Sequence, residues 1–63
     1  MREAYYIIEC FNFNERYPVN GELKQLRRHT TDDFKQHIKM LNKLKGKYDL
    51  ITTRMRIEDN KWN

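Results

Sequence analysis

The chain has 63 residues, with 13 Lys and Arg against 9 Asp and Glu, a net charge of +4 and a single cysteine. This length allows one domain over residues 1–63, and one cysteine excludes an internal disulfide. No stretch reaches the roughly 18–20 apolar residues of a membrane span, and the N-terminus lacks the apolar segment of a signal peptide, so we expect a cytoplasmic protein without membrane contact.

The first predicted element is a strand over residues 4–13, which are rich in Tyr, Ile and Phe and contain neither Gly nor Pro. Residues 14–21 then collect turn formers, and Asn20-Gly21 predicts a tight hairpin turn because both residue types accept a positive φ. We expect a second strand over residues 22–29 that runs back along the first. The spacing of Leu23 and Leu26 leaves a helical turn as the alternative for this segment.

The clearest prediction is a helix over residues 31–45. The Thr-Thr-Asp-Asp segment at 30–33 suits a helix start, because a threonine hydroxyl can accept the first free amide protons and aspartates favour the positive end of the helix dipole. Apolar residues then recur at the spacing of one helical face, and Gly46 is a natural C-cap. The residues of that face are Phe34, Ile38, Leu41 and Leu44.

Residues 48–58 alternate and predict a half-buried third strand, with Ile51, Thr53, Met55 and Ile57 on one face. Residues 59–63 have no periodicity and are expected to form a flexible tail that contains Trp62. The fold class is therefore α+β, a small ββαβ domain. We expect a three-stranded, mainly antiparallel sheet of order 2-1-3 with the helix packed on one face.

The positive charge is concentrated in the middle of the chain, where residues 23–47 sum to +6 while residues 1–22 sum to −2. Lys35, Lys39 and Lys43 form one row on the predicted helix and could follow the phosphates of a nucleic acid. This row lies almost opposite the apolar helix face, where a soluble helix normally carries lysine. We therefore favour a solvated helix surface.

One face of the sheet is expected to stay uncovered, because a single helix covers only one. Alternation in the first strand separates Tyr6, Ile8 and Cys10 from a set that contains Glu9, and we place the set with Glu9 away from the helix. Exposed aromatic patches mark interaction surfaces. The candidate partner-binding residues combine these aromatics, the arginines of the third strand and an arginine pair before the helix: Tyr5, Phe11, Phe13, Arg54, Arg56, Arg27 and Arg28.

Aromatics beside arginine have two functional interpretations. They could stack nucleic-acid bases, or they could anchor a protein target or a dimer. The glycine-containing aromatic signature of the RNA-recognition motif is absent, and Glu9 would repel a phosphate, so protein contact is favoured. A loop or the tail folded over the rings is the third interpretation. For Arg27 and Arg28 we favour protection of an exposed sheet edge over binding of an acidic partner.

Catalytic and ligand-binding motifs are not found in the sequence. Cys10, His29 and His37 do not fall at a metal-ligand spacing, and there is no nucleophile elbow, phosphate loop or carboxylate pair. We expect no enzymatic activity, no metal, no cofactor and no small-molecule substrate. Since so small a chain buries little apolar surface, we expect a protein partner or a homodimer to add stability.

In size, charge and lack of catalytic motifs, the chain resembles the short accessory proteins of bacterial viruses and mobile elements. This resemblance is one of general character and involves no shared motif. It implies a phage or mobile-element protein that acts in the host cytoplasm by binding or inhibiting a host protein. A small basic nucleic-acid-binding protein is the alternative function.

Overall fold

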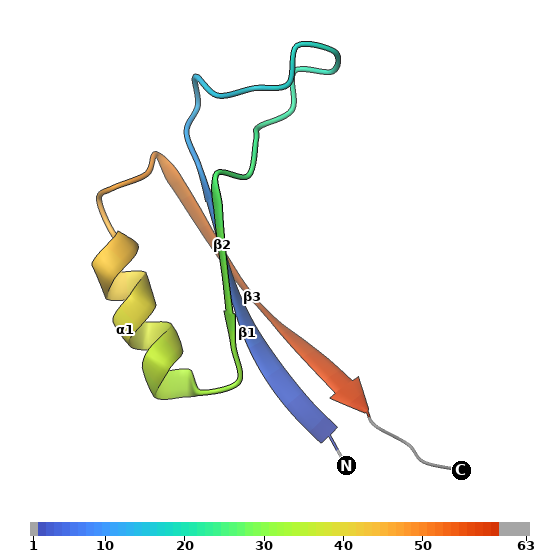
Figure 1. Cartoon of the computed structure of the whole chain (residues 1–63), viewed down its shortest axis with the longest axis vertical. Helices are drawn as coiled ribbons and strands as arrows, with labels where there is room; N and C mark the ends of the chain where they lie inside the picture. The colour runs from blue at the N-terminus through green and yellow to red at the C-terminus, as the bar shows by residue number, and fades with distance from the viewer. Residues whose placement is uncertain (1, 60–63) are drawn as a thin grey trace.

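A computed structural model describes residues 2–59 of the chain. Its elements follow the order β1 (Arg2–Phe11), β2 (Arg27–Thr31), α1 (Phe34–Leu44) and β3 (Leu50–Asp59) (Figure 1). The three strands form one sheet of order β2-β1-β3, in which β1 is antiparallel to both neighbours. The predicted α+β class, the ββαβ order and the central position of the first strand are confirmed.

The two strand pairings differ in length. β1 and β3 pair along all ten residues, from Arg2 opposite Asp59 to Phe11 opposite Leu50, without a bulge. β2 is only five residues long and pairs with β1 from Tyr6 opposite Thr31 to Cys10 opposite Arg27. The sheet therefore has three strands at one end and two at the other.

The helix packs on the face of the sheet that carries Tyr6, Ile8 and Cys10, as the alternation in β1 predicted. Leu44 of α1 forms the core cluster with Ile8 and Cys10, and all three side chains are buried. Tyr6 lies 5.3 Å from the Phe34 ring, measured between centroids. These contacts place the helix over β1 and β2 rather than over β3 (Figure 1).

The helix is too short to cover the whole sheet. Its eleven residues span about 16 Å at about 1.5 Å per residue, whereas the ten residues of β3 span about 33 Å at about 3.3 Å per residue. Beyond α1 and β2, the ends of β1 and β3 continue as two paired strands (Figure 1). We call this part, Arg2–Tyr5 with Arg56–Asp59, the ribbon.

The predicted tight hairpin between the first two strands is wrong. β1 ends at Phe11 and β2 begins at Arg27, so residues 12–26 form a long loop, which Leu26 closes by donating its N–H to the Cys10 carbonyl at 2.9 Å. Asn20-Gly21 does form a turn, but at the tip of this loop. Only the glycine has a positive φ, at 72°.

The second strand is shifted toward the helix relative to the prediction of 22–29, and the helical alternative for that segment is not found. Residues 22–26 belong to the loop, where Leu23 forms an isolated bridge with Arg16. Thr30 and Thr31 lie in β2, because they pair with Ile7 and Tyr6. The periodicity of residues 22–29 was too weak to fix the start of the strand.

The helix begins three residues later than predicted, and its cap is an aspartate instead of a threonine. The Asp33 carboxylate accepts the Lys35 N–H at 2.9 Å, while the Thr31 hydroxyl accepts the Asp33 N–H at 3.1 Å. At the other end Gly46 has a φ of 82°, as expected of a residue that follows a helix.

The expected tail over residues 59–63 is wrong at Asp59, which is the last residue of β3. The other residues of that tail, 60–63 with Trp62, lie outside the described residues. Within the described part of the chain, α1 is too short and too polar to cross a membrane.

Candidate functional site

The face of the sheet opposite α1, here called the open face, collects most of the residues that the sequence singled out. In β1 these are Tyr5 and Phe11, which flank Ile7 and Glu9. β3 sets Arg56 opposite Tyr5 and Arg54 opposite Ile7, and β2 sets Arg28 opposite Glu9. Paired residues point to the same side of a sheet, so five of the predicted residues share this face: Tyr5, Phe11, Arg28, Arg54 and Arg56.

Glu9 lies at the centre of the open face and is held there by neighbours on both sides. Its Oε1 accepts the Arg54 Nε–H at 3.1 Å, and its Oε2 accepts a hydrogen bond from the Gln25 amide. The bond from Gln25, together with the charges of Arg54 and Arg28, holds the pKa of Glu9 below its ordinary value, against the opposite effect of burial. Glu9 is therefore a carboxylate at neutral pH.

Tyr5 and Arg56 form a second group on the open face, at its boundary with the ribbon. The Arg56 guanidinium lies 5.9 Å from the centre of the Tyr5 ring and donates to Glu58 at 2.7 Å. The Tyr5 hydroxyl donates to Glu3 at 2.5 Å, and this bond to a carboxylate raises the pKa of Tyr5. Each of the two β3 arginines thus has a carboxylate partner within its own chain.

The aromatic rings of this face are less exposed than the sequence suggested. Tyr5 and Phe11 are half-buried, and Ile7 between them is fully buried although no helix covers it. Phe13 is 54% exposed, but it follows β1 in the loop, where its N–H donates to the Asp49 carboxylate at 2.9 Å. The open face therefore consists of paired charges and half-buried aromatic rings, and Phe13 lies beside it in the loop that follows β1.

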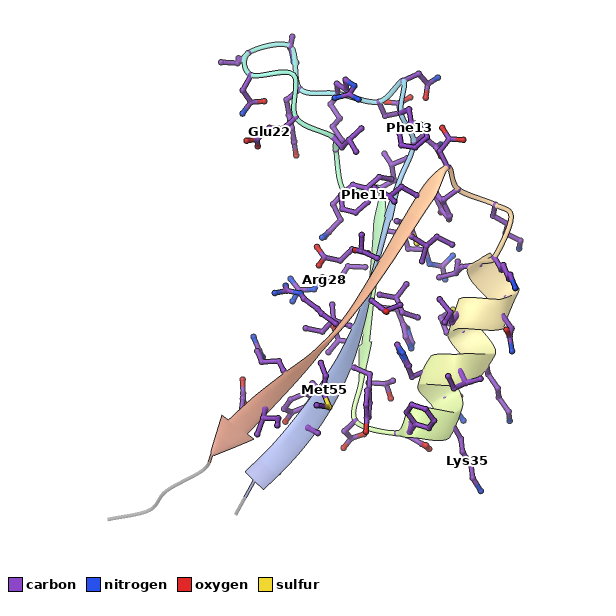
Figure 2. The ribbon with its side chains drawn as sticks, turned by 180° about the vertical axis from the view of Figure 1, so that it is seen from behind. Phe11, Phe13, Glu22, Arg28, Lys35 and Met55 are labelled. Atoms are coloured by element: carbon purple, nitrogen blue, oxygen red, sulfur yellow. The ribbon has the colours of Figure 1, made fainter. Side chains whose placement is uncertain are left out.

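Arg27 does not belong to this face. It is opposite Cys10, whose side chain lies on the helix side, so Arg27 and Arg28 point to opposite sides of β2. Figure 2 shows Arg28 on the side of the sheet away from α1, with Phe11 and Phe13 toward the loop end of β1. Of the two predicted arginines, only Arg28 therefore lies on the open face, because neighbouring residues of a strand alternate between faces.

A second surface, which the sequence analysis did not single out, lies on the helix side of β3. Met55 and Ile57 are each 56% exposed, because α1 lies over β1 and β2 and does not extend over the ribbon. Met55 is opposite Tyr6, which contacts the exposed ring of Phe34. We call Tyr6, Phe34, Met55 and Ile57 the apolar strip. The strand and helix lengths in the sequence could have predicted it.

Cys10 and the two histidines lie in the helix–sheet layer. Burial raises the pKa of the Cys10 thiol. His37 is buried against Tyr6, and both its Nδ1 and the Nε2 of His29 are buried without a hydrogen-bond partner. Over residues 2–59 there is no cluster of three or more metal-ligating side chains and no pocket.

Comparison of the chain with protein-family models, curated proteins and solved structures found no match. No matched protein therefore indicates a function for this chain.

Proposed function

We propose that this chain is a small protein-binding module without enzymatic activity, and that a partner protein docks on the open face. The observation that carries this proposal is the pairing of both β3 arginines with carboxylates, at 3.1 Å for Arg54 with Glu9 and 2.7 Å for Arg56 with Glu58. Binding of phosphates requires cations that are free to replace counterions. Paired charges beside half-buried rings are better suited to a protein surface.

The exposed side chains at the margins of the open face supply contacts for such a partner. Phe13 offers an exposed ring at the loop end, and Arg28 offers a planar guanidinium on β2. Phe and Arg are enriched in protein interfaces, and Arg also binds carboxylates through two hydrogen bonds. The general resemblance to accessory proteins of bacterial viruses and mobile elements suggests a host protein as the partner.

Affinity capture with matched variants tests this proposal. The immobilised chain is exposed to cytosolic extract of the source organism, with and without nuclease, and captured proteins are identified. We expect nuclease-resistant capture that falls by about tenfold or more in the Phe13→Ala/Arg28→Ala double variant. Lys35→Ala is the control, because Lys35 points away from the sheet (Figure 2).

Titration with a labelled single-stranded oligonucleotide at several salt concentrations tests the nucleic-acid alternative. We expect no binding at physiological salt. Tight binding that weakens steeply with salt, together with loss of protein capture after nuclease treatment, would overturn the proposal in favour of a nucleic-acid-binding protein.

A further inference from the structure

The outer edge of β3 differs from the outer edge of β2 in how well it is protected. β2 is five residues long and carries Arg27 and Arg28, and short charged edge strands resist pairing with other chains. β3 is ten residues long, contains neither Pro nor Gly, and keeps an unbroken register with β1. Among the described residues no strand lies beyond it.

The arginines of β3 do not block this edge. Arg54 and Arg56 point to the open face, where Arg54 binds Glu9 of β1 and Arg56 lies against the Tyr5 ring. On the helix side the same edge carries exposed Met55 and Ile57. The edge therefore combines free backbone groups with apolar side chains, which is the combination that favours strand addition.

The ribbon is the part of the sheet that most lacks support. Two paired strands without a third strand or a covering helix are marginally stable in water. The ribbon has neither: β2 ends opposite Tyr6, and α1 begins at Phe34, whose ring also lies against Tyr6. A strand added along β3 would supply the missing neighbour.

A second copy of the chain can supply that strand, and one register pairs opposite charges of β3 without setting like charges opposite each other. In an antiparallel pair related by a twofold axis, with both helices on the same side of the sheet, one residue lies opposite its own copy. The axis passes between these two residues, and we name each register after that residue. An axis at Met55 sets Arg54 opposite Arg56 of the second copy, and an axis at Glu58 sets two glutamates opposite each other. An axis at Arg56 sets Arg54 opposite Glu58 of the second copy but also sets the two Arg56 side chains opposite each other. An axis at Ile57 sets Arg56 opposite Glu58 of the second copy, twice.

We propose that two copies of this chain associate through the outer edges of β3, antiparallel and with Ile57 at the twofold axis, to form one six-stranded sheet. The two ribbons then support each other, and the Ile57 side chains meet on the helix side. This proposal concerns a different surface from the open face and does not depend on the proposed function.

Sedimentation equilibrium of the full chain from about 1 µM to about 1 mM tests the proposal, and circular dichroism confirms that each variant is folded. We expect wild type to form a dimer, and Ile57→Glu to raise the dimer dissociation constant by about tenfold or more. Val19→Glu is the matched control, because Val19 is 95% exposed at the loop tip, and it should leave the constant unchanged.

Charge exchange tests the register. Arg56→Glu alone and Glu58→Arg alone each place like charges opposite one another in a homodimer, so each variant should be mainly monomeric. An equimolar mixture restores both opposite-charge pairs and should form a heterodimer. Failure of the mixture to associate would overturn the Ile57 register.

A wild-type chain that remains monomeric up to about 1 mM would overturn the proposal as a whole. So would a monomer that associates only after residues 60–63 are removed, because the C-terminal end of the same chain would then cover the strip. Protein capture by the open face and self-association through β3 are tested independently, so either result can be negative without affecting the other.

Discussion

Glu9 connects the elements that form the open face. It joins β1 to β3 through Arg54 and to the loop through Gln25, and it lies beside the buried Ile7. A carboxylate in mid-strand is costly unless its hydrogen-bonding capacity is satisfied. Here both oxygens have partners, so Glu9 stabilises the layer rather than interrupting it.

Replacement of Glu9 by Gln should alter the pH dependence of folding. Because the pKa of Glu9 is lowered in the folded chain, its stabilising effect is complete above the ordinary pKa of a glutamate and is lost as the pH falls through the lowered value. We expect Glu9→Gln to reduce the free energy of unfolding at neutral pH, and the difference from wild type to shrink as the pH falls below the ordinary pKa of a glutamate. Urea unfolding at a series of pH values measures this difference.

The same change at Glu15, which is exposed in the loop after β1, is the control. If the difference for Glu9→Gln is independent of pH, or follows that of Glu15→Gln, the role given to this carboxylate is wrong.

The sequence predicted the faces of individual residues well but their exposure poorly. Alternation placed Ile8 and Cys10 under the helix and Tyr5 with Arg56 on the other face, because a period of two follows from strand geometry alone. It did not predict that Ile7 would be buried without a covering helix. Ile7 lies between Thr30 of β2 and Arg54 of β3, so its burial depends on three strands, which no local pattern describes.

At the scale of elements, the start of the helix depends on one side chain. Asp33 accepts the Lys35 N–H and so satisfies one of the free amides of the first turn. We expect Asp33→Ala to lower the free energy of unfolding by about 1 kcal/mol. Thermal or urea unfolding followed by circular dichroism measures this change.

Asp32→Ala is the matched control, because it removes the same charge next to the same helix and leaves the hydrogen bond from Lys35 in place. The control should have the smaller effect. Equal losses would show that charge near the helix, rather than the hydrogen bond, sets the stability.

The turn at Asn20-Gly21 shows why the second strand was misplaced. The turn was predicted in part, since a turn does form here and Gly21 adopts a positive φ, whereas Asn20 does not. The pairing that it implied is not found, because the turn closes a local loop through the Arg16–Leu23 bridge and not the β1–β2 pair. A turn motif specifies its own backbone and leaves the choice of flanking strands to tertiary contacts.

At the scale of the whole molecule, one short helix and one short strand cover only part of a long β1–β3 pair. The extents of the chain, 45 by 29 by 11 Å, describe a flat body. The sequence predicted that a surface would remain uncovered and assigned it to the open face. The structure adds the helix side of β3, where Met55 and Ile57 are more exposed than Tyr5 or Phe11.

Amide hydrogen exchange along β3 at low and high protein concentration tests most directly whether the outer edge of β3 is free in the monomer and pairs with a second copy. We expect the amides on the outer edge of residues 55–59 to exchange fast in dilute solution and slowly in concentrated solution, and Ile57→Glu to abolish the difference. Exchange rates in β3 that are the same at both concentrations would contradict this expectation.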